Sequence, residues 1–309
     1  MHNGYGTHAA AAVSLRDGCA YYAELVRYEG HYGLENADIL PLPDGLMENG
    51  RIANPDALGA FLRRSLAFRW QKMPFIVGIP SSECIFKLLT LPYMGRDEIK
   101  PALYWNFSDY FAYRVEDVLF DAAPAALPSP PQGKINVMAA VSQRKKLMPV
   151  LNALTNRRSC ISAVEPQIVA CARALAPDES EKENLTVLTV FFKTEAHIVL
   201  FYQDCGILFR TVSLRDSGET ENGNWLTVIS EEISKTIEYA VHTLGFDRAA
   251  KIYAAGAGEF ADQLCQRGGF GAEVSRRTFS SGRIADFSFP SDSSWYDVAG
   301  LLMRFIHED

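Results

Sequence analysis

Few residues of this chain stand at spacings that would support catalysis or metal binding. The six cysteines and six histidines are scattered, and no Cys-x-x-Cys pair is present. Because metal sites need clustered ligands, these side chains predict neither a metal site nor a redox motif. No Ser-His-Asp, Cys-His or paired-carboxylate arrangement suggests a catalytic site of another kind.

One segment is a candidate nucleotide contact because it has two closely spaced glycines. The run IYAAGAG at Ile252–Gly258 is an apolar strand that ends in a Gly-x-Gly turn, and its candidate contact residues are Ala255, Gly256, Ala257 and Gly258. Glycine lets backbone N–H groups approach a ligand closely. The same pattern is typical of a tight turn from a strand into a helix, so the sequence leaves both interpretations open.

Length and charge limit the class of protein. A chain of 309 residues is too long for one ordinary core and predicts two domains. The formal charge of -7, without a basic stripe, argues against nucleic acid as a partner. Apolar runs are too short to span a bilayer, and the first residues do not have the pattern of a signal peptide. These features predict a cytoplasmic protein.

The sequence contains two copies of one strand pattern, and these strands would position the candidate residues. Each copy has three β-type runs joined by tight turns, and an amphipathic helix follows each copy. In the first copy the turns lie at Arg16-Asp17-Gly18 and Glu29-Gly30. This duplication predicts a two-domain α/β fold of the actin and Hsp70 class, which is a duplicated ribonuclease H-like fold. The expected strands are Ala9–Val13, Ala20–Val26, Tyr32–Leu40, Leu185–Phe192, Ala196–Tyr202 and Ile207–Leu214.

The segment between the two copies has a different order of predicted strands and helices. Strands are predicted at Phe75–Ile79, Cys84–Leu91 and Ile135–Val141, and a proline-rich loop at Ala122–Gly133. A helix is expected from Arg96, although Pro101 requires it to begin late or to bend. Further helices are predicted after Asn54, at Lys145–Asn156, at Ala163–Leu175 and over Ile229–Leu244, with an acidic linker at Pro177–Asn184.

The order of these segments resembles type IV pilus assembly proteins of the PilM family. The resemblance is carried by the Phe75–Asp121 stretch, by Leu34–Ile52, Gly206–Arg210 and Tyr253–Gly258, and by Ala299–Arg304, so it covers nearly the whole chain. It implies a small subdomain inserted in the first of two actin-like domains. We therefore expect a first domain at 1–83 plus 159–178, an inserted subdomain at 84–158 and a second domain at 179–309.

In this fold class two hairpin turns clasp a nucleotide, and the family pattern is Asp-x-Gly in both turns, with a lysine further along the first. This chain departs from the pattern. Aligned on Ala23-Glu24-Leu25, it has Ser14, Arg16 and Tyr21 in place of the first aspartate, the glycine and the lysine, and Val190 and Phe192 stand in the second turn. We therefore expect neither ATP nor Mg²⁺ as a cofactor, and no enzymatic activity.

Acidic side chains nevertheless occur in both turns. Asp17 lies in the first turn and Glu195 in the second, and together they could hold a cation. Exposed acidic residues are also ordinary in turns, so the sequence does not decide between a cation site and a solvated surface.

The resemblance also implies a partner, the N-terminal tail of the inner-membrane protein PilN. In the family this tail has an Asn-Leu-Leu-Pro-like core and lies in a groove between the first domain and the inserted subdomain. Extended peptides bind to exposed sheet edges beside apolar pockets. Candidate contacts are Lys87, Trp105, Tyr110 and Phe111, although large aromatic side chains could equally form the core of the subdomain.

Three functions follow as hypotheses. The first is a cytoplasmic scaffold of a type IV pilus assembly complex, attached to the inner membrane through its partners, which could include other pilus or secretion ATPases. The second is the actin-like domain of a GspL-type secretion protein. Such proteins continue into a membrane helix, whereas this sequence ends in FIHED without an apolar run. The third is a nucleotide-binding actin-like ATPase, which the altered turns disfavour.

Overall fold

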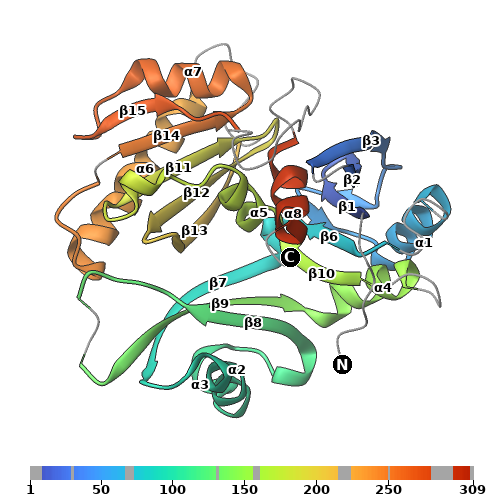
Figure 1. The fold of residues 1–309 in the computed structure, drawn as a ribbon, viewed down its shortest axis with the longest axis horizontal. Coiled ribbons are helices and arrows are strands. Elements are labelled where there is room, and N and C mark those ends of the chain that lie inside the picture. The colour runs from blue at the N-terminus through green and yellow to red at the C-terminus, as the bar shows by residue number, and fades with distance from the viewer. Residues whose placement is uncertain are drawn as a thin grey trace. The chain divides into compact units, whose positions relative to one another are not determined.

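The computed structural model describes residues 9–28, 31–66, 73–129, 132–155, 161–214, 224–249, 251–279 and 295–306 (Figure 1). The chain forms two compact units. The first comprises 1–83, 145–174 and 279–309, and the second comprises 84–144 and 175–278. The predicted turn at Glu29-Gly30 lies outside the described residues, as do Pro130, Pro131 and Cys160.

The first unit is built on a five-stranded sheet with the order β10-β6-β1-β2-β3. β1, β2 and β3 form antiparallel hairpins, whereas β6 lies parallel to β1 and β10 parallel to β6. The β1–β2 turn ends in Gly18, whose φ of 75° is in the left-handed region that glycine adopts without strain. The strands are β1 (Ala9–Arg16), β2 (Cys19–Tyr28), β3 (His31–Pro41), β6 (Phe75–Ile79) and β10 (Ile161–Pro166).

Helices of the first unit pack closely because glycine stands at two of their contacts. A β-carbon on Gly59 of α1 would lie 2.8 Å from Ala153 Cβ of α4, and one on Gly300 of α8 would lie 1.8 Å from Ala170 O of α5. Asn54 caps α1 as predicted, since its Oδ1 accepts a hydrogen bond from Ala57 N at 3.1 Å. The helices are α1 (Pro55–Leu66), α4 (Arg144–Leu154), α5 (Gln167–Ala174) and α8 (Tyr296–Ile306).

The second unit repeats the first sheet, with the order β13-β12-β11-β14-β15. β11, β12 and β13 are antiparallel neighbours, β14 is parallel to β11, and β15 is parallel to β14. Read from its other end, as β15-β14-β11-β12-β13, the second sheet has the same strand order and directions as the first. This match confirms the predicted duplication. The strands are β11 (Thr186–Phe191), β12 (Glu195–Tyr202), β13 (Cys205–Ser213), β14 (Lys251–Gly256) and β15 (Glu273–Arg276).

One face of this second sheet is covered by α6 (Asn224–Leu244) and α7 (Gly258–Arg267) (Figure 1). Ile229 and Ile233 of α6 and Leu264 of α7 share a buried cluster with inward residues of the strands, such as Val187 and Ile198. The apolar spacing of α6 therefore has the role expected from the sequence, which is to bury one helical face.

A smaller three-stranded sheet with the order β7-β9-β8 also belongs to the second unit. One face packs on two helices around Ile99, Leu103 and Phe107. On the other face Leu88 and Met138 pack against the core of the five-stranded sheet. The elements are β7 (Cys84–Pro92), β8 (Val118–Pro124), β9 (Lys134–Gln143), α2 (Arg96–Trp105) and α3 (Phe107–Tyr110).

The boundary between the units at 83/84 lies where a domain boundary was expected, whereas the other unit boundaries, at 144/145, 174/175 and 278/279, differ from the expected ones at 158/159 and 178/179. Helix α4 packs on α1 and α8 packs on α5, so both helices join the first unit. The three-stranded sheet is formed by residues that lie between β6 and β10 in the sequence. On the face away from α2 and α3, Leu88 and Met138 pack against the core of the second five-stranded sheet.

Two local expectations, and one of two alternatives for a third, were wrong. Residues 163–166, expected to begin a helix, belong to the parallel strand β10, because this strand pairs with β6 and the helix α5 begins only at Gln167. Helix α2 does not begin late, since it starts at Arg96 and includes Pro101, which removes one N–H donor without ending the helix. Residues 122–124 belong to β8 rather than to a loop.

The remaining short elements are β4 (Met47–Glu48), β5 (Arg51–Ile52) and the 3-10 turns η1 (Ser81–Glu83), η2 (Val115–Asp117) and η3 (Glu179–Glu181).

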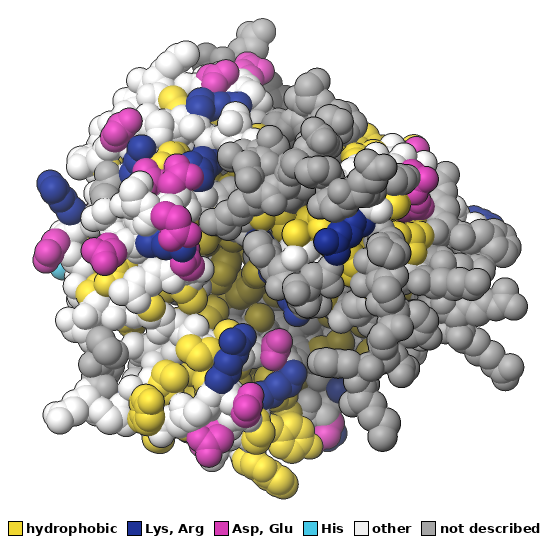
Figure 2. All heavy atoms as spheres, viewed as in Figure 1, with side chains coloured by type: hydrophobic (Ala, Val, Ile, Leu, Met, Phe, Trp, Pro, Cys, Tyr) yellow, Lys and Arg dark blue, Asp and Glu magenta, His cyan; other side chains and the backbone are white. Residues whose placement is uncertain are grey.

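Among the helices in the described part of the chain, none has an apolar stretch of the length that a membrane span requires. On the face drawn in Figure 2, cationic and anionic side chains are interspersed rather than gathered by sign.

Candidate functional site

The first predicted phosphate turn follows β1, where Ser14 and Arg16 replace the expected aspartate and glycine. Both side chains are directed at one carboxylate, that of Asp297 at the start of α8. Ser14 Oγ donates a hydrogen bond to Asp297 Oδ2 at 2.5 Å, and Arg16 Nε donates to the same oxygen at 3.0 Å. Arg16 Nη2 also pairs with Asp297 Oδ1.

This carboxylate is fully buried and has several donors around it. Gln167 Nε2, at the start of α5, lies 3.4 Å from Asp297 Oδ2 and donates to Ser14 Oγ at 3.1 Å and Leu15 O at 2.8 Å. The backbone N–H of Val298 donates to Asp297 Oδ1 at 2.8 Å. A buried charge with this many partners is a fixed part of the fold.

The guanidinium of Arg16 is held charged by the same contacts. Burial acts to lower the pKa of Arg16, but the charge and hydrogen bonding of Asp297 outweigh it and leave this pKa above its ordinary value. Tyr21, the residue in place of the expected lysine, places its ring 3.9 Å from Arg16 Cζ, and Trp295 packs edge-on against Tyr21. Tyr21 therefore supports the ion pair in place of a phosphate-binding ammonium group.

The second turn, between β11 and β12, is filled by apolar side chains. Val190 is fully buried in β11, and Phe192 is buried against the ring of His197, with 5.1 Å between the ring centroids. A hydrogen bond of 2.8 Å from Phe192 N to Glu195 O closes the turn. The large side chain of Phe192 thus occupies the position at which glycine would admit a phosphate.

The two acids proposed for a cation belong to different units, Asp17 to the first and Glu195 to the second. Glu195 Oε1 lies 3.6 Å from His197 Nε2. No group of three or more His, Cys, Asp or Glu side chains in the described ranges is arranged to hold a metal ion.

The Gly-x-Gly turn lies between β14 and α7. Gly256 has a φ of 93°, and a β-carbon there would lie 2.1 Å from Phe191 O of the neighbouring strand. Ala257 N donates to the same oxygen at 2.9 Å, whereas Gly258 has open space around it. Close approach of two strands is thus enough to require Gly256, and Ala255 is buried in β14.

The predicted partner contacts separate into surface and core. Trp105 is 81% exposed at the end of α2, whereas Phe111 is buried and stacked on Phe107. Tyr110 packs against the same core. Lys87, on the edge strand β7, donates a hydrogen bond from Nζ to Tyr110 O at 2.8 Å. Trp105 and Lys87 are therefore accessible to a partner, and Phe111 is not.

Asp297 was not predicted as a site residue. Its sequence signal was an acidic residue at the start of the apolar helix Tyr296–Ile306, but nothing local connects it to Ser14 or Arg16. Tyr93, which precedes α2, and Tyr104, in the last turn of α2, are also exposed and were not among the predicted contacts.

No protein-family model and no curated protein matches the sequence. Solved structures do resemble the protein over nearly all its length, among them two from pilus and secretion systems. One is in the PilM-PilN type IV pilus biogenesis complex, with 18% identity, a TM-score of 0.75, and coverage of 96% of this chain and 98% of that chain.

The other is the cytoplasmic domain of EpsL, an inner-membrane component of the type II secretion system of Vibrio cholerae. It has 12% identity and a TM-score of 0.50, and the match covers 96% of this chain and 95% of that domain. With the duplicated sheets, these likenesses establish that the chain has the actin-like fold that the sequence resemblance predicted.

Proposed function

We propose that this protein is a cytoplasmic scaffold of a type IV pilus or related secretion assembly. In this role it docks the N-terminal tail of a PilN-like inner-membrane protein and has no ATPase activity. The observation that carries the proposal is the match to the PilM-PilN complex over nearly the full length of both chains. Through this partner the protein would be held at the inner membrane.

The absence of ATPase activity is supported by the two turns. Transfer of a phosphoryl group requires a held metal and donors aimed at the phosphates. In the first turn Arg16 and Ser14 are committed to Asp297, and in the second Phe192 replaces glycine. The residues present therefore do not fit a magnesium nucleotide in the manner of the fold class.

Peptide docking is supported by the edge strand β7. Its position at the end of the β7-β9-β8 order leaves one backbone edge without a strand partner among the described residues. Ile85 and Lys87 are exposed on this strand. A peptide can add to such an edge, with its register set by backbone hydrogen bonds and its side chains in adjacent pockets.

A labelled peptide comprising the first ~20 residues of the cognate membrane protein, added to the full chain, tests the proposal by fluorescence anisotropy. We expect saturable binding that Lys87→Glu and Trp105→Ala each weaken, because both side chains are accessible and a large aromatic is a typical hot spot. Lys193→Glu makes the same charge change on an exposed lysine outside the three-stranded sheet and serves as the control.

The two test substitutions should leave the midpoint of thermal unfolding nearly unchanged, because both side chains are exposed. Undiminished affinity in the Lys87→Glu, Trp105→Ala double variant would place docking elsewhere. No affinity for the peptide in the wild type would contradict the proposal.

A second candidate is the actin-like domain of a GspL-type secretion protein, which the match to the EpsL domain favours. Under this function the protein would bind cytoplasmic components of a type II secretion system rather than a pilus tail. Co-purification with epitope-tagged components of the two systems, expressed from the source genome, separates the two candidates.

A further inference from the structure

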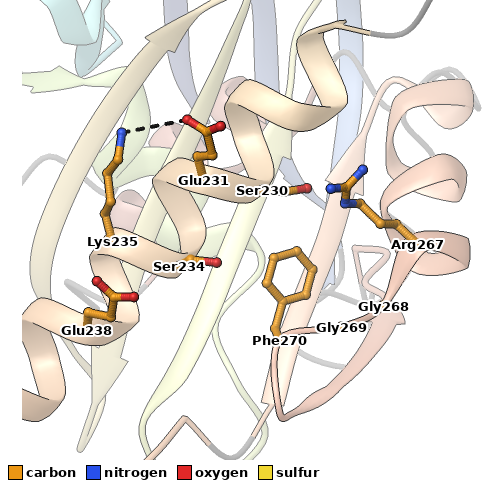
Figure 3. A pocket seen from close by; sticks show the side chains of 9 residues that line it. All are labelled: Ser230, Glu231, Ser234, Lys235, Glu238, Arg267, Gly268, Gly269 and Phe270. Carbon is orange, nitrogen blue, oxygen red and sulfur yellow. Dashed lines mark ion pairs between the residues drawn. The ribbon is translucent and has the colours of Figure 1, made fainter.

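A pocket of about 680 Å³ lies within the second unit, between the middle of α6 and the segment that follows α7 (Figure 3). Its volume is in the range of ordinary small-molecule sites. The pocket is separate from the two turns and from β7. It is lined by Ser230, Glu231, Ser234, Lys235, Glu238, Arg267, Gly268, Gly269 and Phe270.

Short residues give this pocket its room. Ser230 and Ser234 lie one helical turn apart on α6, so their small side chains face the same side of the helix. Gly268 and Gly269 have φ values of 57° and 90°, which let the chain turn sharply at the end of α7. Longer side chains at the two serine positions would fill the space that is present between the helix and this turn.

Arg267 is the cation available to a ligand. Figure 3 shows its guanidinium directed from the end of α7 toward Ser230 across the pocket. Its side chain is exposed, and no ion pair of Arg267 occurs within the described part of the chain. Lys235, by contrast, is committed to Glu232 Oε1 at 2.8 Å and lies 4.0 Å from Glu231. An anionic group would therefore pair with Arg267.

Two other groups complete the pattern. The ring of Phe270 projects into the space between Ser234 and Arg267 (Figure 3) and offers a flat surface for stacking. Glu238 of α6 also lines the pocket, and its carboxylate can accept hydrogen bonds from hydroxyl or amino groups. Cation, flat ring and carboxylate thus line one pocket.

We propose that this pocket binds a small organic anion that carries a flat ring and hydrogen-bond donors. A nucleoside monophosphate and an aromatic amino acid share this chemistry. The phosphate or carboxylate would pair with Arg267 in the bidentate manner favoured by guanidinium groups, the ring would stack on Phe270, and the hydroxyl or ammonium donors would reach Glu238. The inference does not depend on the pilus or secretion role.

Isothermal titration of the full chain tests it, with AMP, GMP, phenylalanine and tryptophan as probes. Adenosine lacks the anion and ribose 5-phosphate lacks the ring, so both should bind less tightly than AMP. A dissociation constant below about 1 mM for one nucleotide or amino acid is the expected result, and it shows which source fits. Binding of none of the four probes would overturn the proposal.

Two variants locate the binding. We expect Arg267→Gln and Phe270→Ala each to weaken it about tenfold, because the first removes the anion partner and the second the stacking surface. Arg248→Gln, an exposed arginine of the same unit outside the pocket, is the matched control and should bind like the wild type. Circular dichroism checks that each variant is folded. Affinity unchanged in folded Arg267→Gln and Phe270→Ala would place the ligand elsewhere and contradict the assignment.

Discussion

Asp297 and Arg16 form a buried ion pair, with Asp297 fully inaccessible to solvent. Removing one partner of such a pair leaves the other charge without compensation in a poorly solvated place. Ser14 and Gln167 are hydrogen-bonded to the same carboxylate, so one substitution would disturb the whole first turn. The pair thus has a structural role at the place where the fold class uses a metal-orienting carboxylate.

We expect Asp297→Ala to lower the free energy of unfolding by about 3–5 kcal/mol, because Arg16 would lose its counter-charge. Urea unfolding followed by circular dichroism measures this loss. Arg114→Ala removes an arginine whose ion pairs with Glu116 and Asp117 are exposed, and as the control it should cost less than about 1 kcal/mol. A loss below about 1 kcal/mol in Asp297→Ala would show that the pair is not important for stability.

Glu181 provides a pH-dependent contribution in the second unit. Partial burial acts to raise its pKa, but hydrogen bonds from Tyr253 Oη at 2.5 and 2.6 Å and from Lys251 Nζ at 3.2 Å outweigh it. The pKa of folded Glu181 is therefore below its ordinary value. A depressed pKa stabilises the fold above the unfolded pKa, and this contribution is lost as pH falls through the folded value.

The wild type should accordingly lose more unfolding free energy than Glu181→Gln between about pH 6 and pH 3. The neutral glutamine cannot titrate, so only the contribution of this carboxylate differs. Urea unfolding at several pH values measures the two slopes, and Glu116→Gln, at an exposed position, should follow the wild type. Equal slopes for wild type and Glu181→Gln would contradict the assignment.

At the scale of elements, the β14–α7 turn shows how one pattern can have two explanations. Gly256 touches the backbone of β11, whereas Gly258 has open space at the start of α7. If the turn were built only to contact a nucleotide, replacing either glycine would have a similar effect on stability. Strand packing gives importance to Gly256 alone, and that difference can be measured without a ligand.

We expect Gly256→Ala to destabilise the protein by more than about 3 kcal/mol, since its β-carbon would collide with Phe191 O and its φ of 93° is strained for alanine. Gly258→Ala should change stability by less than about 0.5 kcal/mol. Urea unfolding of the two variants makes the comparison. A similar loss in both variants would show that the turn has another constraint.

At the scale of the whole molecule, the proposed scaffold role predicts that Mg-ATP is not a tight ligand. Both turns lack the metal-orienting carboxylate and the glycine of the fold class. We expect calorimetry with Mg-ATP to show no dissociation constant below about 10 µM, which corresponds to about -7 kcal/mol. Repeating the titration with Arg267→Gln removes any contribution of the α6–α7 pocket. Tighter binding that survives in this variant would restore the ATPase hypothesis.

The sequence determined the elements that depend on neighbours along the chain. The two meanders, the Asn54 cap and the apolar stripe of α6 follow from local spacing, turn residues and periodicity, so the duplicated fold could be predicted. The loss of the phosphate-turn pattern was also readable, because it concerns the identity of Ser14, Arg16 and Phe192. The prediction was wrong for residues 163–166, because a buried parallel strand and a helix have similar apolar composition.

Only the tertiary structure decided which distant segments meet. Arg16 and Asp297 are 281 positions apart, and no local signal joins them. The sequence also could not show that Phe111 is buried in a core and Trp105 is exposed on the surface, since both are aromatic residues close in sequence. Periodicity reports which face of an element is apolar, but not which other element covers it. The partner of a side chain is set by the packing of whole elements, and that information is distributed over the entire chain.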